Sequence, residues 1–348
     1  MDNSRTIPNT AQDPDNTLNN STGSAVSKLP STSIKQRLMS WEFFLLLITA
    51  AVCVANSFAS PYFLDPWNLS DATFNFVEKA IVALPLALLI ICREIDLSVA
   101  SIIALASVAM GYAAQWGADN TTLLIIGISV GICCGLFNGL LVTHFAIPSI
   151  VITIGTMSLF RGLSYILLGD QVLKDYPAGF DYFGQGYVYW VFSVEFTLFL
   201  ALAVVFYLLL HHTNFGRRTY AIGKNPTGAF YSGINVKRHR LLLFILVGAF
   251  AGLAAVLLTS RLGSTRPTIA LGWELSIITM VVLGGVNIMG GSGSIHGVFI
   301  AVFLMGFVTF GLGLLNVPGI VMSIIVGAML IAVIACPVLL ARYLQRPR

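Results

Sequence analysis

The feature that most constrains this chain is a stretch of 67 residues, 275–341, that contains no Asp, Glu, Lys or Arg. Shorter charge-free runs cover 43–64, 97–118, 120–160, 196–216 and 241–260. A membrane-spanning helix needs about 20 predominantly apolar residues. Charged residues make up only 10% of the chain, whereas soluble domains carry about 25%. The sequence therefore predicts an integral membrane protein.

Lipid offers the backbone no hydrogen-bond partners, so the apolar runs are predicted to be helices. We predict an all-α polytopic membrane protein with about ten transmembrane helices in one domain, 41–341. Residues 1–40, rich in Ser, Thr, Asn and Pro, are predicted to be a disordered tail, and 342–348 a short basic tail. The predicted spans are 41–60, 73–92, 96–115, 121–143, 148–168, 187–210, 241–260, 274–290, 297–315 and 318–340.

Basic residues predict the orientation of these spans. The loop 211–240 carries six Lys and Arg and no acid, and cytoplasmic loops are enriched in such bases. With ten spans, both termini then lie in the cytoplasm together with this loop. Arg261 and Arg266 are exceptions, because the same count places them outside, where they would line an outward vestibule.

Glycines recur at helical spacing in two of the predicted spans. Gly127, Gly131, Gly135 and Gly139 are four residues apart, as are Gly248 and Gly252. Small residues at this spacing let helix backbones approach closely. The pattern indicates either tight packing within one bundle or a face that forms a dimer.

Sequence patterns for enzyme chemistry are absent from the chain. There is no Gly-x-x-x-x-Gly-Lys-Ser/Thr phosphate loop, no Cys or His pair at metal-ligand spacing, and no Gly-x-Ser-x-Gly nucleophile motif. The net charge of +4 is far from the dense basic face of a nucleic-acid-binding protein. We therefore predict no catalytic residue, no metal ligand and no nucleic-acid partner.

Charged residues interrupt the apolar sequence between two predicted spans, at Arg93-Glu94-Ile95-Asp96-Leu97-Ser98. One interpretation is a polar turn at the membrane surface, with Asp96 or Ser98 capping the next helix. The other places some of these groups in a translocation path or a gate. The residues alone leave both open.

The basic loop contains a predicted short helix. Asn225 can cap a helix that Pro226 begins, since proline is tolerated at the first helical position, and Gly233 would end it. Ala229, Phe230 and Ile234 would give this helix an apolar face. A solvated loop does not need such a face, so the helix either docks on a partner or lies on the lipid headgroups.

A third stretch, 282–297, holds six glycines in sixteen residues. This composition predicts close backbone approach and a short or broken helix. Half-helices of this kind commonly line substrate paths.

Together these stretches resemble the permease subunits of ATP-binding-cassette importers for monosaccharides such as ribose, xylose, rhamnose and the sugar-derived autoinducer-2. The resemblance covers about residues 41–340. It rests on five segments in the family's order, which are Glu94–Ser98, Gly135–Gly139 with Ile147-Pro148, Thr153–Thr156 with Arg161-Gly162, the Gly216–Ile234 pattern, and the glycine-rich stretch 283–293. Arg93-Glu94 and Ala100 stand where ribose permeases usually have glycines, which favours the rhamnose or autoinducer-2 branch.

The resemblance implies a transport subunit of the bacterial cytoplasmic (inner) membrane that is not itself an enzyme. Its implied partners are cytoplasmic ATP-binding subunits, a second permease subunit (identical or homologous), an extracytoplasmic sugar-binding protein and the lipid bilayer. ATP would be bound by the partner, and this chain would hold no cofactor. The implied coupling helix comprises Gly223, Asn225, Pro226, Ala229, Phe230, Gly233 and Ile234, and the implied path or gate comprises Asp96, Ser98, Asn138, Thr153 and Asn287.

An alternative function is a secondary carrier or facilitator for a small polar solute. Such a carrier would need coupling carboxylates within its spans or an inverted repeat, and neither pattern is evident in the sequence. A membrane-embedded enzyme is a weaker alternative for the reasons given above.

Overall fold

The computed structural model describes residues 41–344, without the side chains of 333–334 and 336–344. The predicted tail 1–40 and most of the predicted tail 342–348 lie outside the described residues. The elements are α2 (Trp41–Ala59), α3 (Pro66–Phe74), α4 (Val77–Ile91), α5 (Val99–Gln115), α6 (Asn120–Phe145), α7 (Ser149–Leu168), α8 (Tyr182–Gln185), β1 (Tyr187–Tyr189), β2 (Phe192–Ser193), α9 (Val194–His212), α10 (Asn214–Lys224), α11 (Pro226–Tyr231), α12 (Val236–Leu262), α13 (Trp273–Leu283), α14 (Ile295–Leu314) and α15 (Gly319–Leu344).

Every one of the ten predicted spans overlaps with an α-helix, which confirms an all-α polytopic membrane protein. Among the described residues, six helices are long and apolar enough to cross a membrane, namely α2, α6, α7, α9, α12 and α14. The bent pair α3 and α4, which meet at 54°, would make a seventh. Two further apolar helices, α5 and α13, are shorter, as is the part 319–332 of α15. The count of ten spans therefore stays a prediction.

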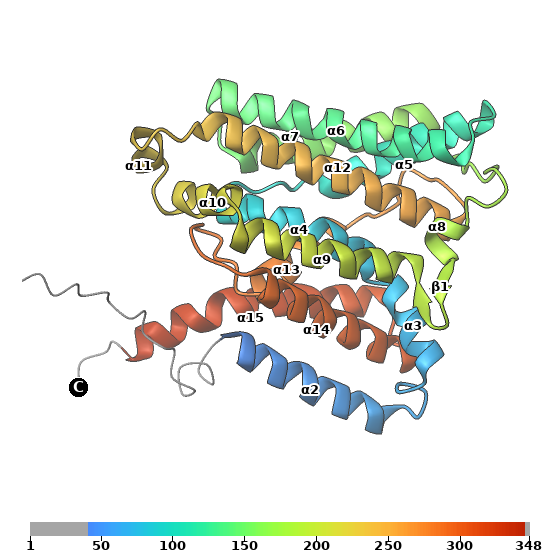
Figure 1. Ribbon diagram of the computed structural model, residues 1–348. Helices are drawn as coiled ribbons and strands as arrows, with labels where there is room; N and C mark the ends of the chain where they lie inside the picture. Colours follow the sequence, from blue (N-terminus) through green and yellow to red (C-terminus); the bar gives the residue numbers. More distant parts are fainter. Residues whose placement is uncertain (1–40, 345–348) are drawn as a thin grey trace, which may run out of the picture. The chain divides into compact units, whose positions relative to one another are not determined.

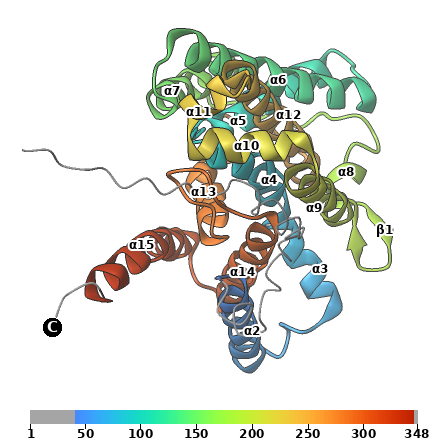
Figure 2. The same cartoon turned by 60° about the vertical axis from the view of Figure 1, so that its left-hand side comes forward.

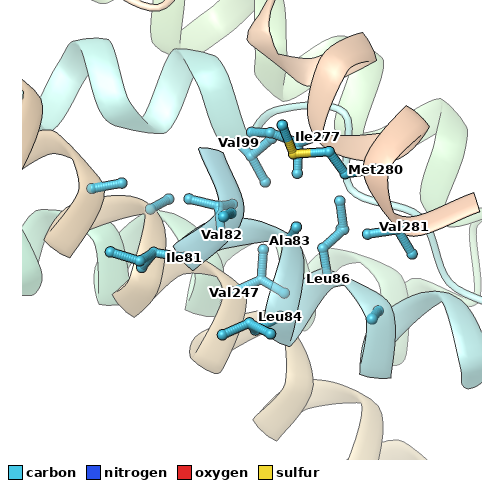
Figure 3. Close-up of a cluster of buried hydrophobic side chains, with 14 of the residues drawn as sticks. Ile81, Val82, Ala83, Leu84, Leu86, Val99, Val247, Ile277, Met280 and Val281 are labelled. Carbon is cyan, nitrogen blue, oxygen red and sulfur yellow. The ribbon is translucent and has the colours of Figure 1, made fainter. Parts of the chain in front are cut away.

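Helix α4 lies at the centre of the bundle. Almost all of its side chains are buried, and it contacts α9, α12, α13 and α14. Figure 3 shows Ile81, Leu84 and Leu86 of α4 among side chains of α5, α12 and α13. Beyond Glu78 and Lys79 in its first turn, α4 is apolar on all sides and can therefore be buried in the bundle. This burial fixes the position of the chain segment that follows it.

The closest helix pair is α6 and α12, which run side by side in Figure 1. A Cβ atom on Gly131 would lie 2.8 Å from the Gly252 nitrogen, and one on Gly248 would lie 2.9 Å from the Gly135 nitrogen. No side chain fits between the two backbones at this crossing. The glycine spacing therefore packs helices within one chain here, as the first of its two interpretations expected.

The bundle has two distinct ends. One end carries α10, α11 and the glycine-rich loop between α13 and α14, and the other carries α3, α8 and the β1–β2 hairpin (Figure 1). The break between α4 and α5 lies at the α10 end, because α10 packs against α4 there. We call these the α10 end and the hairpin end.

Several boundaries differ from the prediction. Residues 187–193, predicted as the start of a span, form the hairpin, and α9 begins at Val194. Helix α13 ends at Leu283 rather than near 290, because Gly285 adopts φ +83°. Helix α10 was not predicted at all.

Candidate functional site

The segment between α4 and α5 leaves the helical path at Arg93, which has φ +68°. A positive φ is uncommon for a side chain larger than glycine. The Glu94 backbone N–H still bonds to the Leu89 carbonyl at 3.1 Å, so the turn is closed. Residues 94–98 then form neither helix nor strand, and α5 begins at Val99. After this strained turn, Glu94, Asp96 and Ser98 are buried, whereas Ile95 and Leu97 are half-buried.

Asp96, Ser98, Asn138 and Thr153 meet there as a buried polar cluster, each of them fully buried. Asp96 Oδ1 accepts hydrogen bonds from the backbone nitrogen and the hydroxyl of Ser98, at 2.8 and 2.6 Å. The Asn138 amide nitrogen donates to Ser98 Oγ at 2.8 Å and lies 3.4 Å from Asp96 Oδ2.

Thr153 joins this cluster through its hydroxyl, which donates to the Ile95 carbonyl at 3.3 Å. Three separate helices, α5, α6 and α7, thus converge on one short segment. Ser98 is the N-cap of α5 but forms no capping bond with its side chain. Asp96 bonds to Ser98 and not to the first turn of the helix, so the helix-cap interpretation is wrong.

An ion pair anchors the same segment to α12. Arg240 Nη1 lies 2.9 Å from Glu94 Oε1, and the Ser149 hydroxyl accepts from the Ile95 backbone nitrogen at 3.1 Å. Burial raises the pKa of the Glu94 carboxyl, and the Arg240 charge opposes that shift. A buried carboxylate whose partner is removed is costly, so this pair ties α12 firmly to the break.

Helix α10 contacts the same break from the outside. Arg93 Nη2 donates to the Lys224 carbonyl at 3.1 Å. Gly223 packs on the backbone carbonyl of Ile91, where a Cβ atom would overlap it. In turn, the Gly291 nitrogen donates to that carbonyl at 2.8 Å. Glycine is required at 223 because three backbone segments meet at this point.

The short helix in the basic loop is α11, as predicted. Asn225 caps it by accepting a hydrogen bond from the Gly228 nitrogen at 2.9 Å, and Pro226 is its first residue. Gly233 has φ +81° and lies just beyond its end. The predicted apolar face is only partly correct, because Ala229 is buried against the protein.

The exposed apolar side chains of α11 are Phe230 and Tyr231, which are 64% and 83% exposed. They border a groove of about 670 Å³ that continues to the start of α12. Ile234 lines the groove, together with Lys237 and Arg240. Tyr231 was missed by the sequence reasoning, although its place beside Phe230 was a usable signal.

Asn287 does not belong to the buried cluster. It lies exposed in the glycine-rich loop, where its side chain accepts from the Met289 nitrogen at 2.9 Å. The loop is nonetheless held against α10, because the Tyr220 hydroxyl donates to the Gly293 carbonyl at 2.7 Å. The structure therefore brings four of the five predicted path residues together and leaves the fifth in a turn.

At the hairpin end, Arg261, which the sequence analysis placed in an outward vestibule, forms an ion pair that the sequence did not predict. Arg261 Nε donates to Glu78 Oε1 at 2.7 Å, and Glu78 is completely buried. Both oxygens of the buried Glu195 carboxyl lack a hydrogen-bond partner among the described residues. In the predicted orientation Arg261 lies outside, and its pairing with Glu78 would compensate its charge there. In the part of the chain that is described, no group of three or more His, Cys, Asp or Glu side chains could hold a metal ion.

Residues 68–334 match the family model described as branched-chain amino acid transport system / permease component. Among curated proteins, the chain is similar to the autoinducer 2 import system permease protein LsrD of Escherichia coli (strain K12), with 37% identity over 300 residues. The proteins of the same name from Shigella flexneri and E. coli O157:H7 are 37% and 36% identical. Each alignment covers 84% of this chain and 91% of the relative. No solved structure matches the chain.

Proposed function

The chain belongs to this family of transport-system permease components, and from that premise we propose which solute it carries and how it is driven. The predicted family, a permease of monosaccharide ATP-binding-cassette importers, is confirmed. The proposed solute is autoinducer-2 or a monosaccharide such as rhamnose, delivered by an extracytoplasmic binding protein. The names of the similar proteins support the first of these.

The protein is a multi-pass membrane transport subunit. We propose that ATP hydrolysis takes place on separate cytoplasmic subunits and that this chain binds no cofactor of its own. A second permease subunit, identical or homologous, would complete the pathway. The alternative of a secondary carrier loses its support, because the family is one of permease components of larger transport systems.

The observation that carries the coupling proposal is the exposed aromatic pair Phe230 and Tyr231 beside a groove with a basic rim. Clustered aromatic anchors surrounded by polar residues are typical of protein interfaces. Lys237 on the rim suits an acidic partner surface, whereas the charge of Arg240 is already paired with Glu94. We propose that the ATPase subunit binds here.

A direct series of contacts would transmit movement of α11 to the buried cluster. Asn225 caps α11 and also ends α10. The Lys224 carbonyl, next to it, is held by Arg93 at 3.1 Å. Arg93 begins the segment that carries Asp96. A shift of α11 would therefore pull on the gate formed by Asp96, Ser98, Asn138 and Thr153 without any longer route through the bundle.

The orientation is part of the proposal, with both termini and the α10 end in the cytoplasm. Six bases in the loop 211–240 support it. A cysteine in place of Thr227, on α11, should resist a membrane-impermeant thiol reagent in intact cells and react in lysed cells. Labelling in intact cells would contradict this orientation.

Phe230→Asp tests the coupling proposal. The variant should reach the membrane at normal abundance, lose the ATPase subunit on purification and stop importing rhamnose and autoinducer-2. Burial of one aromatic anchor contributes about 2 kcal/mol, and a buried carboxylate would oppose docking.

Phe145→Asp is the matched control. Phe145 is 62% exposed at the same end, on α6, and does not line the groove. If Phe230→Asp retains the ATPase subunit and full uptake, as the control variant should, then α11 does not dock on the ATPase and lies on the lipid headgroups instead.

A further inference from the structure

A cavity of about 700 Å³ lies at the hairpin end between α4, α13, α14 and α15. Its size falls in the range of about 300–1,000 Å³ that is usual for small-molecule sites. It is separate from the buried Asp96 cluster, none of whose residues lines it. Figure 2 shows α15 lying beside α13 and α14.

The wall that α15 contributes is made of small residues. Gly319, Ser323 and Gly327 are four residues apart and line the cavity. A Cβ atom added to Gly319 or Gly327 would meet nothing within 4 Å. The other face of the helix carries Ile320 and Ile324, which are 80% and 65% exposed. The small stripe therefore borders open space and does not pack on a helix.

The wall that faces this stripe carries an aromatic ring and a cation. Lys79 Nζ lies 4.8 Å from the centre of the Trp273 ring and donates to the Asn75 carbonyl at 3.2 Å. The hydroxyls of Thr309 and Ser323 donate to backbone carbonyls of their own helices, which leaves their oxygens free to accept.

These groups define what the cavity can hold. None of the described residues that line it is Asp or Glu, and a lone ammonium repels cations. An anion would have to give up its hydration for one ammonium that is already engaged, which is unfavourable. A neutral ring with many hydroxyls fits better, since its C–H face can pack on an indole and its hydroxyls can donate and accept around the ring.

We propose that this cavity is where the imported solute, a neutral polyhydroxylated ring, rests after it leaves the binding protein, with Trp273 as its platform and Lys79 as a donor to its hydroxyls. The inference rests on the proposed function, because it assigns a place to the solute of that importer. Entry of the solute displaces the Lys79 ammonium from the ring face. The stripe Gly319, Ser323 and Gly327 leaves room for it.

Two substitutions test the site in the complete transporter. Trp273→Ala should lower the maximal rate of rhamnose or autoinducer-2 uptake about tenfold, the factor for about 1.4 kcal/mol of lost contact, and Trp273→Phe should restore most of it. Gly327→Leu should obstruct the cavity and lower uptake at normal abundance. Ile324→Phe, which adds bulk on the opposite face of the same helix, should transport normally, as should Trp116→Ala, at an exposed tryptophan outside the cavity.

A direct readout comes from a cysteine at Ser323. Its reaction with a methanethiosulfonate reagent should be slowed by the neutral sugar that the wild type imports and not by gluconate, which is charged. Wild-type uptake in both Trp273→Ala and Gly327→Leu, or equal protection by gluconate, would overturn the site.

A failure of this site can be distinguished from a failure of the proposed function. That function fails if wild-type uptake continues without ATP and no ATPase subunit co-purifies, whatever the cavity variants do. The cavity inference fails when uptake is ATP-dependent and the cavity variants leave it unchanged.

Discussion

Two regions of this protein use small residues at the same spacing for opposite purposes. On α6, Gly131 and Gly135 let the backbone of α12 come so close that no side chain fits between. On α15, Gly319 and Gly327 border a cavity of about 700 Å³. The spacing therefore tells which face of a helix is small. It does not tell whether a backbone or a solute occupies the space.

Helix α4 shows the same contrast, because two adjacent residues on it face the packed helix α12 and the cavity, respectively. Glu78 turns toward α12 and pairs with Arg261, whereas Lys79 turns toward the cavity. The packed side holds its charge in a buried pair. The cavity side keeps its charge where a solute can meet it. Substitutions on the packed side should change stability, and those on the cavity side should change transport.

The largest loss of stability is expected for Arg261→Met. The change leaves Glu78 buried without its partner, close to the unpaired Glu195 carboxyl. Loss of one member of a buried pair costs about 3–5 kcal/mol, so the melting temperature in detergent and the membrane yield should both drop. The double variant Glu78→Leu/Arg261→Met should recover much of the loss. Lys79→Met, one residue along, should have a melting temperature close to that of the wild type. If both single variants lower the melting temperature equally, the packed side and the cavity side of α4 do not differ in the way described.

The second-largest loss of stability is expected for Gly131→Val. The added methyl groups must push α12 away, because the nearest atoms belong to its backbone. Overpacking of this kind costs about 1–3 kcal/mol, and the thermal unfolding of purified protein would measure it. Gly155→Val on α7, where a Cβ atom meets nothing within 4 Å, is the control. A wild-type melting temperature for Gly131→Val would mean that the two helices are not so tightly packed.

Asp96→Asn should have a smaller effect on stability and a strong one on uptake. The new amide group can still accept from Ser98, but its nitrogen cannot accept from the Asn138 amide as Asp96 Oδ2 does. The lost hydrogen bond is long, at 3.4 Å, so its contribution to stability is small. We expect import at matched abundance to fall strongly. Near-normal import would mean that the cluster only holds α5, α6 and α7 together.

The sequence predicted the ten apolar helices and the short helix α11 because both have local signals. Apolar length marks each of the ten, and Asn225-Pro226 with Gly233 marks α11, whereas α10 has no such signal. The four residues of the buried cluster were also identified, from motif resemblance. Ala229 was placed on the wrong side of α11, because six residues are too few to show which face is buried.

Long-range pairs could not be predicted in this way. Nothing near Glu78 in the sequence points to Arg261, 183 positions away, and Glu195 lies at the edge of a charge-free run. The cavity depends on where α15 lies relative to α13, which no local pattern encodes. The sequence therefore gave no reason to assign Trp273 and Lys79 to a cavity, because both lie at the ends of predicted spans.

The smallest change in stability is expected for Gly327→Ala, and it should be an increase where the other variants show a decrease. Alanine is a better helix former than glycine by about 1 kcal/mol, and the added methyl group meets no atom within 4 Å. The melting temperature should therefore rise slightly, whereas the same change at Gly131 should lower it, because there the methyl group meets the α12 backbone. One methyl group is too small to obstruct a cavity of about 700 Å³, so uptake should stay near the wild-type rate. If Gly327→Ala destabilises the protein as Gly131→Ala does, a packed helix and not a cavity adjoins α15, and the distinction between the two glycine stripes is lost.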